Sequence, residues 1–79
     1  MADTAALAAE AASLRDNEAF QASLSGIKAR ALEVLSVIDA DDTLGILKQQ
    51  AIVKVVDDLN GDLEGFIARG KPKRPPGIA

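Results

Sequence analysis

Large apolar residues recur at steps of three and four along most of this chain, which is the pattern of amphipathic helices rather than of strands. Between positions 20 and 38 the apolar stripe consists of Phe20, Leu24, Ile27, Ala31, Val34 and Ile38. Leu32 and Leu35 widen the stripe, which favours a small helical packing over a narrow two-stranded coiled coil. Gly26 lies inside this predicted helix, where we expect it to let another backbone come close.

A second long helix is predicted after a short acidic turn. The segment 39–42 holds three aspartates, which favour a turn followed by a helix cap because carboxylates suit the positive end of a helix. From Thr43 the apolar spacing resumes and stays in phase across the pair Asn60-Gly61. A continuous helix here has about 26 residues and a length of roughly 40 Å. Gly70 is its expected end.

The beginning of the chain is rich in alanine and carries only a thin apolar stripe. Asp3 or Thr4 can cap a helix over residues 5–14, because a short side chain with an oxygen accepts from the free amides of the first turn. A helix of about ten residues is marginal in water, so we expect this segment to order by docking onto another surface. The alternative is a partly disordered leader.

Together these patterns predict an all-α protein built around a helical hairpin of two long amphipathic helices. Residues 1–15 form the short helix or leader, residues 16–69 the hairpin, and residues 70–79 an extended basic tail. The sequence leaves open whether the two long helices pair within one chain or between chains.

Composition removes several classes of chemistry. The 79 residues include no Cys and no His, so disulfides, thiolate nucleophiles, Cys/His zinc sites and the commonest general base are absent. Asp39 and Asp41 begin like a calcium loop, but Leu44 stands where that loop needs Gly and Gln50 replaces its bidentate Glu. We therefore predict a protein that is not an enzyme, with no cofactor and no metal site.

The start of the chain also bears on its location. Met1 is followed by Asp3 and several alanines, without a basic segment or a long apolar stretch. This pattern predicts neither a signal peptide nor a transmembrane helix. We expect a soluble intracellular protein.

The net charge of −3 hides an uneven distribution. Residues 69–79 hold four of the nine basic residues and no acid, so the remaining five basic and twelve acidic residues give the body a charge of −7. Lys71, Lys73 and Arg74 stand among prolines that favour an extended chain. With no aromatic residue to stack on bases, this tail is expected to bind an acidic protein surface first and nucleic-acid phosphate second.

Two helices with such wide apolar faces leave part of each face uncovered when they pair only with each other. We therefore expect a protein partner or self-association, with no membrane and no small-molecule substrate. The residues predicted to carry these contacts are Phe20, Leu24, Ile27, Leu63, Phe66, Ile67, Lys71, Lys73 and Arg74.

Residues 35–70 carry Asp41-Asp42, Ile46, Gln50, Val55 to Leu59 and Phe66-Ile67 before a Gly-Lys end. This segment, about half of the chain, resembles the short helical-hairpin proteins encoded among head and packaging genes of tailed bacteriophages. The resemblance implies a small virion, decoration or head-assembly component that is present in many copies.

Two other functions are compatible with the sequence. One is a nucleic-acid-associated accessory factor whose basic tail touches phosphate, although the acidic body argues against a large footprint. The other is an antitoxin-like or adaptor protein that orders its alanine-rich end on a protein partner.

Overall fold

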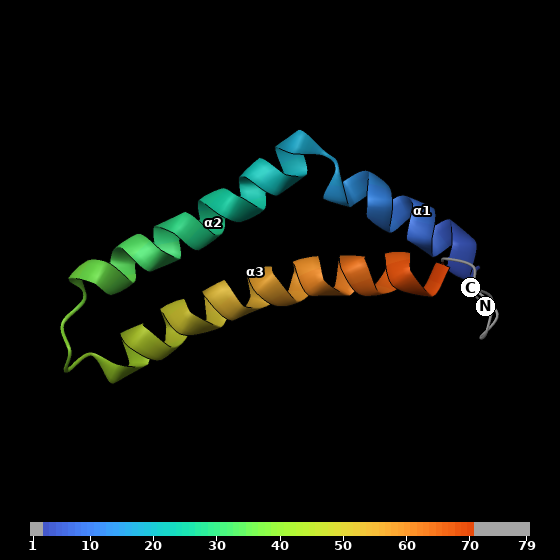
Figure 1. Ribbon diagram of the computed structural model, residues 1–79. Helices are drawn as coiled ribbons and strands as arrows, with labels where there is room; N and C mark the ends of the chain where they lie inside the picture. Colours follow the sequence, from blue (N-terminus) through green and yellow to red (C-terminus); the bar gives the residue numbers. More distant parts are fainter. Residues whose placement is uncertain (1–2, 71–79) are drawn as a thin grey trace, which may run out of the picture.

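The computed structural model describes residues 3–70, and three helices account for most of them (Figure 1). Helix α1 is Thr4–Arg15, α2 is Glu18–Val37 and α3 is Thr43–Gly70. The described part of the chain contains no strand, so the predicted all-α class is confirmed. Helix α3 has 28 residues and runs without a break through Asn60-Gly61, as its apolar phase predicts.

The three helices form an elongated packing rather than a sphere. Helices α2 and α3 run antiparallel as a hairpin, and α1 folds back from α2 onto the C-terminal half of α3 (Figure 1). The described residues extend over 56 × 29 × 28 Å. Among the described helices, α2 is therefore the only neighbour of the N-terminal half of α3.

Each helix begins at a side chain that caps it. The Asp3 side chain accepts from a backbone amide of the first turn of α1 at 3.1 Å. Asn17 Oδ1 accepts from the amide of Phe20 at 2.8 Å, and Asp42 Oδ1 accepts from the amide of Gly45 at 2.9 Å. These bonds satisfy amides that have no partner inside the helix, which fixes where α1, α2 and α3 start.

Helix α1 is ordered by contact with α3 of the same chain. Ala11 packs against Leu63 and Ile67 in the main buried cluster, and Phe20 and Phe66 pack at its edge. The small side chains of the alanine-rich helix allow this approach but add little apolar area themselves. The sequence predicts that α1 docks onto another surface, and in the structure that surface is the C-terminal half of α3.

Gly70, and not Gly26, lies directly against a second helix. A Cβ at Gly26 would meet only the end of the Arg30 side chain, at 3.5 Å, so the predicted approach of a second backbone there is wrong. A Cβ at Gly70 would overlap the Ala8 methyl group of α1 and lie 3.4 Å from the Thr4 carbonyl oxygen. Gly70 thus belongs to the contact between α1 and α3.

The basic tail, residues 71–79, lies outside the described residues. Its predicted extended conformation therefore stays a prediction, as do contacts from Lys71, Lys73 and Arg74. Gly70, the expected end of the second long helix, is the last described residue of α3.

Candidate protein-interaction surface

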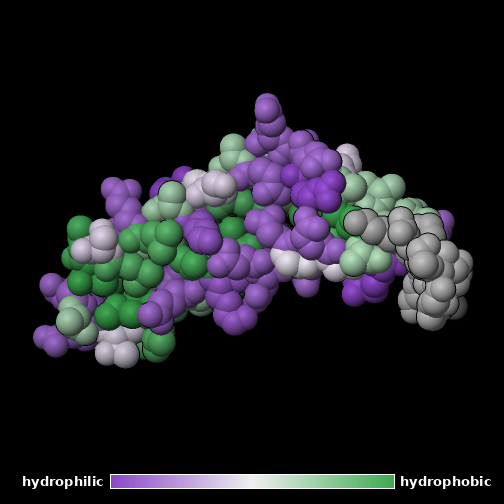
Figure 2. Space-filling view, in the orientation of Figure 1, coloured by the Kyte–Doolittle hydropathy of each residue, from purple (hydrophilic) through white to green (hydrophobic). Residues whose placement is uncertain are grey.

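The buried core is small and the exposed apolar surface is large. Among residues 3–70, six residues are buried and all are apolar: Ala11, Leu24, Ala31, Val56, Leu63 and Ile67. The exposed large apolar residues in that range are Leu14, Ile27, Leu32, Val34, Val37, Leu44, Leu47, Val55 and Leu59. In Figure 2, apolar side chains gather at the hairpin end, over the end of α2 and the start of α3. That is the half of the hairpin that α1 does not reach.

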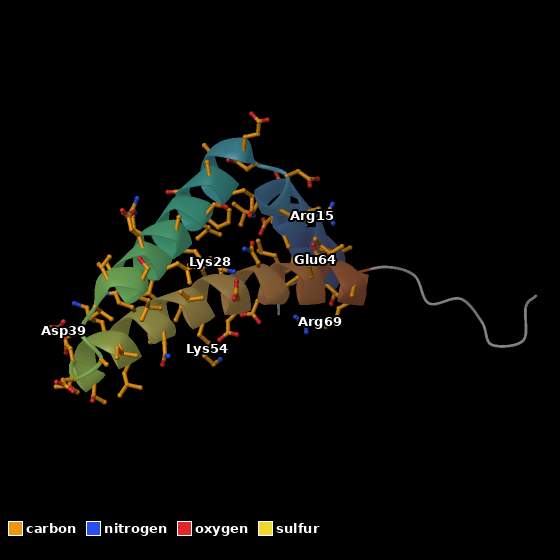
Figure 3. All side chains as sticks on the ribbon, turned by 60° about the vertical axis from the view of Figure 1, so that its left-hand side comes forward. Arg15, Lys28, Asp39, Lys54, Glu64 and Arg69 are labelled. Carbon is orange, nitrogen blue, oxygen red and sulfur yellow. The ribbon has the colours of Figure 1, made fainter. Side chains whose placement is uncertain are left out.

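The two sides of the hairpin differ in chemistry. Lys28 Nζ donates to Asp57 Oδ1 at 2.7 Å, which places a polar pair across α2 and α3 on one side. Figure 3 shows Lys28 between the two helices and Lys54 on the side of α3 away from α2. Val55 and Asp57 are two residues apart and thus about 200° apart around α3, with the buried Val56 between them. Val55 therefore lies on the side opposite the Lys28–Asp57 pair.

The same division holds on α2. The buried residues Leu24 and Ala31 mark the side of α2 that faces α3. Lys28 lies to one side of that line, and Ile27 and Val34 lie to the other. We call the side without the polar pair the apolar flank; its large side chains are Ile27, Val34, Leu44, Val55 and Leu59.

Within residues 3–70, no third helix covers the apolar flank. Leu44 is 82% exposed and Val55 63%, while Ile27, Val34 and Leu59 are 36–39% exposed. An apolar surface of this kind, next to charged residues, is typical of a site that contacts another protein. The coarse prediction of a surface suited to a protein partner or an oligomer therefore has a definite location in the fold.

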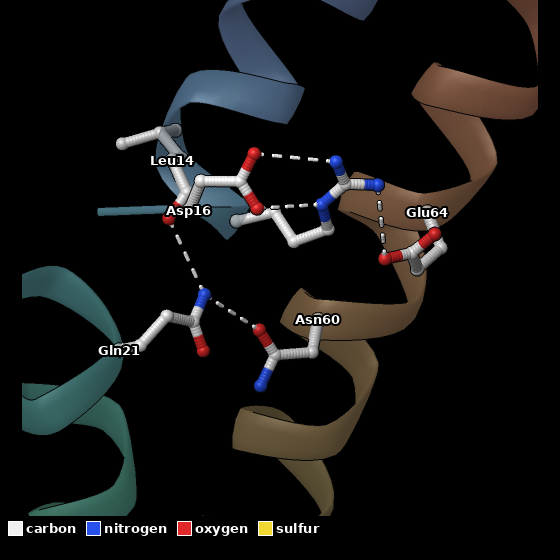
Figure 4. Close-up of polar contacts among 6 residues, drawn as sticks. Leu14, Asp16, Gln21, Asn60 and Glu64 are labelled. Carbon is white, nitrogen blue, oxygen red and sulfur yellow. Dashed lines mark hydrogen bonds and ion pairs between the residues drawn. The ribbon is translucent and has the colours of Figure 1, made fainter. Parts of the chain in front are cut away.

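A polar junction holds the three helices together where α1 meets α2 (Figure 4). Gln21 Nε2 donates to the Leu14 carbonyl at 3.4 Å and to Asn60 Oδ1 at 3.2 Å, so one side chain of α2 contacts both α1 and α3. Arg15 donates to Asp16 from two nitrogens, at 3.0 and 3.3 Å. This junction fixes the corner of the fold and lies away from the apolar flank.

The Arg15 guanidinium lies beside two acidic side chains, Asp16 and Glu64. Its hydrogen bond to Asp16, together with its charge, lowers the pKa of the Asp16 carboxyl, and the pKa of Arg15 is raised in return. A longer ion pair joins Arg15 Nη1 to Glu64 Oε1 at 3.8 Å. All three side chains are largely solvated, so these pairs contribute modestly to the fold.

The residues that the sequence predicts as partner contacts fall into two groups. Leu24, Leu63 and Ile67 are buried within the chain, and Phe20 and Phe66 are half-buried against the core cluster. Their apolar surface is used mainly inside this fold, by contacts with α1 and between α2 and α3. Of the predicted helical set, Ile27 is the member that is exposed, and it lies on the apolar flank.

The structure adds Val34, Leu44, Val55 and Leu59 to the flank. All four belong to the apolar pattern of the sequence. That pattern does not indicate which of its residues are buried by α1 or between α2 and α3. The sequence does contain one indication, the adjacent pair Val55 and Val56. Two neighbouring residues of a helix point about 100° apart, so both cannot pack against the same neighbouring helix.

The acidic segments have local roles in the described structure. Asp39, Asp41 and Asp42 form the turn before α3 through backbone hydrogen bonds, and Asp42 caps that helix. Lys54 Nζ donates to Asp58 at 2.7 Å, which raises the pKa of Lys54. Within residues 3–70 there is no pocket and no group of three or more acidic side chains placed to hold a metal ion. No helix in that range is both long and apolar enough to span a bilayer.

Comparison of the chain with protein-family models, curated protein sequences and solved structures finds no match.

Proposed function

We propose that this chain is a non-enzymatic helical assembly protein that works in multiple copies by presenting its apolar flank to other protein chains. The observation that carries the proposal is the exposure of Leu44 and Val55 on a side of α3 that no other described helix covers. Complete burial of the exposed parts of the five flank residues would contribute about 5 kcal/mol, as an upper estimate. That amount is comparable to the whole stability of a small domain.

The biological setting of the proposal comes from the resemblance of residues 35–70 to small phage head and packaging proteins. A virion, decoration or head-assembly component acts in many copies through repeated protein contacts. A short chain with an open apolar surface and a charged tail suits that role. In this setting, the basic tail would bind an acidic surface of a neighbouring protein through Lys71, Lys73 and Arg74.

The net negative charge of residues 3–70 favours a protein partner over nucleic acid. Residues 3–70 contain all twelve acidic residues and six of the nine basic ones, a charge of −6. Such a body repels a phosphate backbone at any contact beyond the tail. The adaptor alternative needs α1 to be free for a partner, whereas α1 already packs on α3.

The test is to place a charge on the apolar flank without disturbing the core. Val55→Asp should reduce self-assembly or partner binding, because a carboxylate would be desolvated in the contact. Gln50→Asp is the matched control, since Gln50 is an exposed residue of α3 about 140° from Val55. Sedimentation velocity reports assembly, and far-UV circular dichroism reports helix content. Equal assembly by both variants and the unaltered chain would refute the proposal.

A further inference from the structure

One stripe of α3, exposed except for the half-buried Phe66, has a symmetric pattern about Val55. The residues that stand four, seven and eleven positions to either side of Val55 are, in pairs, Ala51 and Leu59, Lys48 and Asp62, and Leu44 and Phe66. Steps of four, seven and eleven residues return to within about 40° of the starting direction on a helix. These residues therefore share one stripe with Val55.

A two-fold axis through Val55 would convert this pattern into a set of complementary contacts. When two identical helices pack antiparallel about such an axis, a residue n positions before the centre lies opposite the residue n positions after it. Lys48 of each copy then lies beside Asp62 of the other, and small Ala51 lies against larger Leu59. A parallel pairing would instead set Lys48 against Lys48 and Asp62 against Asp62, which is unfavourable.

The charges of this stripe are free for such contacts. Lys48 and Asp62 are exposed, and neither forms an ion pair among the residues that the structure describes. Lys28 and Lys54, by contrast, are each paired with an aspartate within the chain. Arg69, fourteen positions after Val55, has its guanidinium 4.8 Å from the Phe66 ring centre.

The five flank residues supply the apolar centre of an interface with a second copy, and the polar residues of the stripe supply its edge. At about 25 cal/mol per Å², the roughly 5 kcal/mol of the five flank residues corresponds to about 200 Å² of apolar surface on each copy. A stable interface buries roughly 800 Å² on each partner. Lys48, Ala51 and Asp62 of the same stripe supply additional area.

We propose that the occupant of the apolar flank is a second copy of this chain, with the two α3 helices packed antiparallel about a two-fold axis at Val55. The inference rests on the proposed assembly function and specifies its partner and register. The two hairpins together form a four-helix arrangement in which the sides carrying the Lys28–Asp57 pairs face outward.

Charge exchange tests the register. Lys48→Glu and Asp62→Lys each replace two attractive contacts by two repulsive ones, so each should raise the dissociation constant of the dimer by roughly tenfold at low salt. The double variant restores both contacts and should regain affinity. An equimolar mixture of the two single variants should form heterodimers, because each chain then meets the opposite charge. Glu33→Lys, on α2, controls for the change in net charge caused by Asp62→Lys.

Cross-linking gives a second readout that does not depend on charge. The chain has no cysteine, so Val55→Cys introduces a single thiol at the proposed axis. A short bis-maleimide should join two such chains at low micromolar concentration. Gln50→Cys, on the other side of α3, should not be cross-linked under the same conditions, although the chain still dimerises.

Three outcomes separate this inference from the proposed function. A dimer with charge-exchange rescue and Val55→Cys cross-linking supports both. A dimer whose dissociation constant does not change with the charge exchange overturns the Val55 register but not the proposed assembly function. A full-length chain that is monomeric at all concentrations and binds no partner overturns both.

Discussion

Replacement of Gly70 by alanine should destabilise this protein, which is the reverse of the usual effect in a helix. Alanine is favoured over glycine by about 0.8–1.0 kcal/mol at an exposed interior helix position. At Gly70, however, the new methyl group would overlap the Ala8 methyl of α1. Neither group has a rotamer that relieves the overlap, so the helices themselves must move apart.

The magnitude follows from the balance of these two effects. Overpacking in a close contact costs typically 1–3 kcal/mol, and it acts here on the contact that orders α1. After the gain in helix propensity, the expected net loss is about 1 kcal/mol, with a decrease of roughly 4–8 °C in melting temperature for a domain of this size. Gly61→Ala is the matched control, because a Cβ there would meet nothing within 4 Å and should raise stability.

Thermal and urea unfolding, followed by circular dichroism, measure both variants. Ala8→Gly in the Gly70→Ala background removes the opposing methyl group and should recover stability relative to Gly70→Ala alone. If Gly70→Ala stabilises the protein as much as Gly61→Ala does, then α1 does not pack on α3 at this point and the three-helix arrangement is wrong.

Three further substitutions test the core, a cap and the polar junction. Leu63→Ala should cost about 2–5 kcal/mol in urea unfolding, because Leu63 is 6% exposed in the main cluster; a loss below 1 kcal/mol would contradict that packing. Asn17→Ala should cost about 1 kcal/mol and speed hydrogen exchange at the Phe20 amide, while unchanged exchange would argue against the cap. Because the pKa of Asp16 is lowered in the folded protein, its contact with Arg15 stabilises the fold fully at pH values above 3.8, the ordinary pKa of an aspartate. This contribution is lost as the pH falls through the pKa of Asp16 in the folded protein. Carboxyl NMR titration should show this pKa rising in Arg15→Gln, and no rise would exclude the Arg15 contact.

The helix positions are predictable from the sequence because their signals are local. Asn17 and the acidic turn 39–42 mark the starts of α2 and α3, and the apolar phase carries α3 across Asn60-Gly61. The partner of α1 is not predictable in this way. An alanine-rich stripe fits many surfaces, and the close contact at Gly70 depends on a chain reversal that no short pattern specifies.

The candidate site shows the same limit. The apolar pattern contains both the residues that the fold buries and those that it leaves exposed, such as Val56 and Val55. The side of α3 that remains open depends on where α2 crosses and where α1 docks. Periodicity therefore predicts that apolar surface is left over, while the Lys28–Asp57 pair and the position of α1 determine where it lies.

The most direct test of assembly is the solution mass of the full-length, unaltered chain across a wide concentration range. Multi-angle light scattering after size exclusion should give a mass that rises with concentration from the 8.2 kDa of one chain to at least twice that value. Val55→Asp should shift the transition to higher concentration while helix content stays the same. A mass of 8.2 kDa up to millimolar concentration, with a cooperative melt that does not depend on concentration, would contradict self-assembly through the apolar flank.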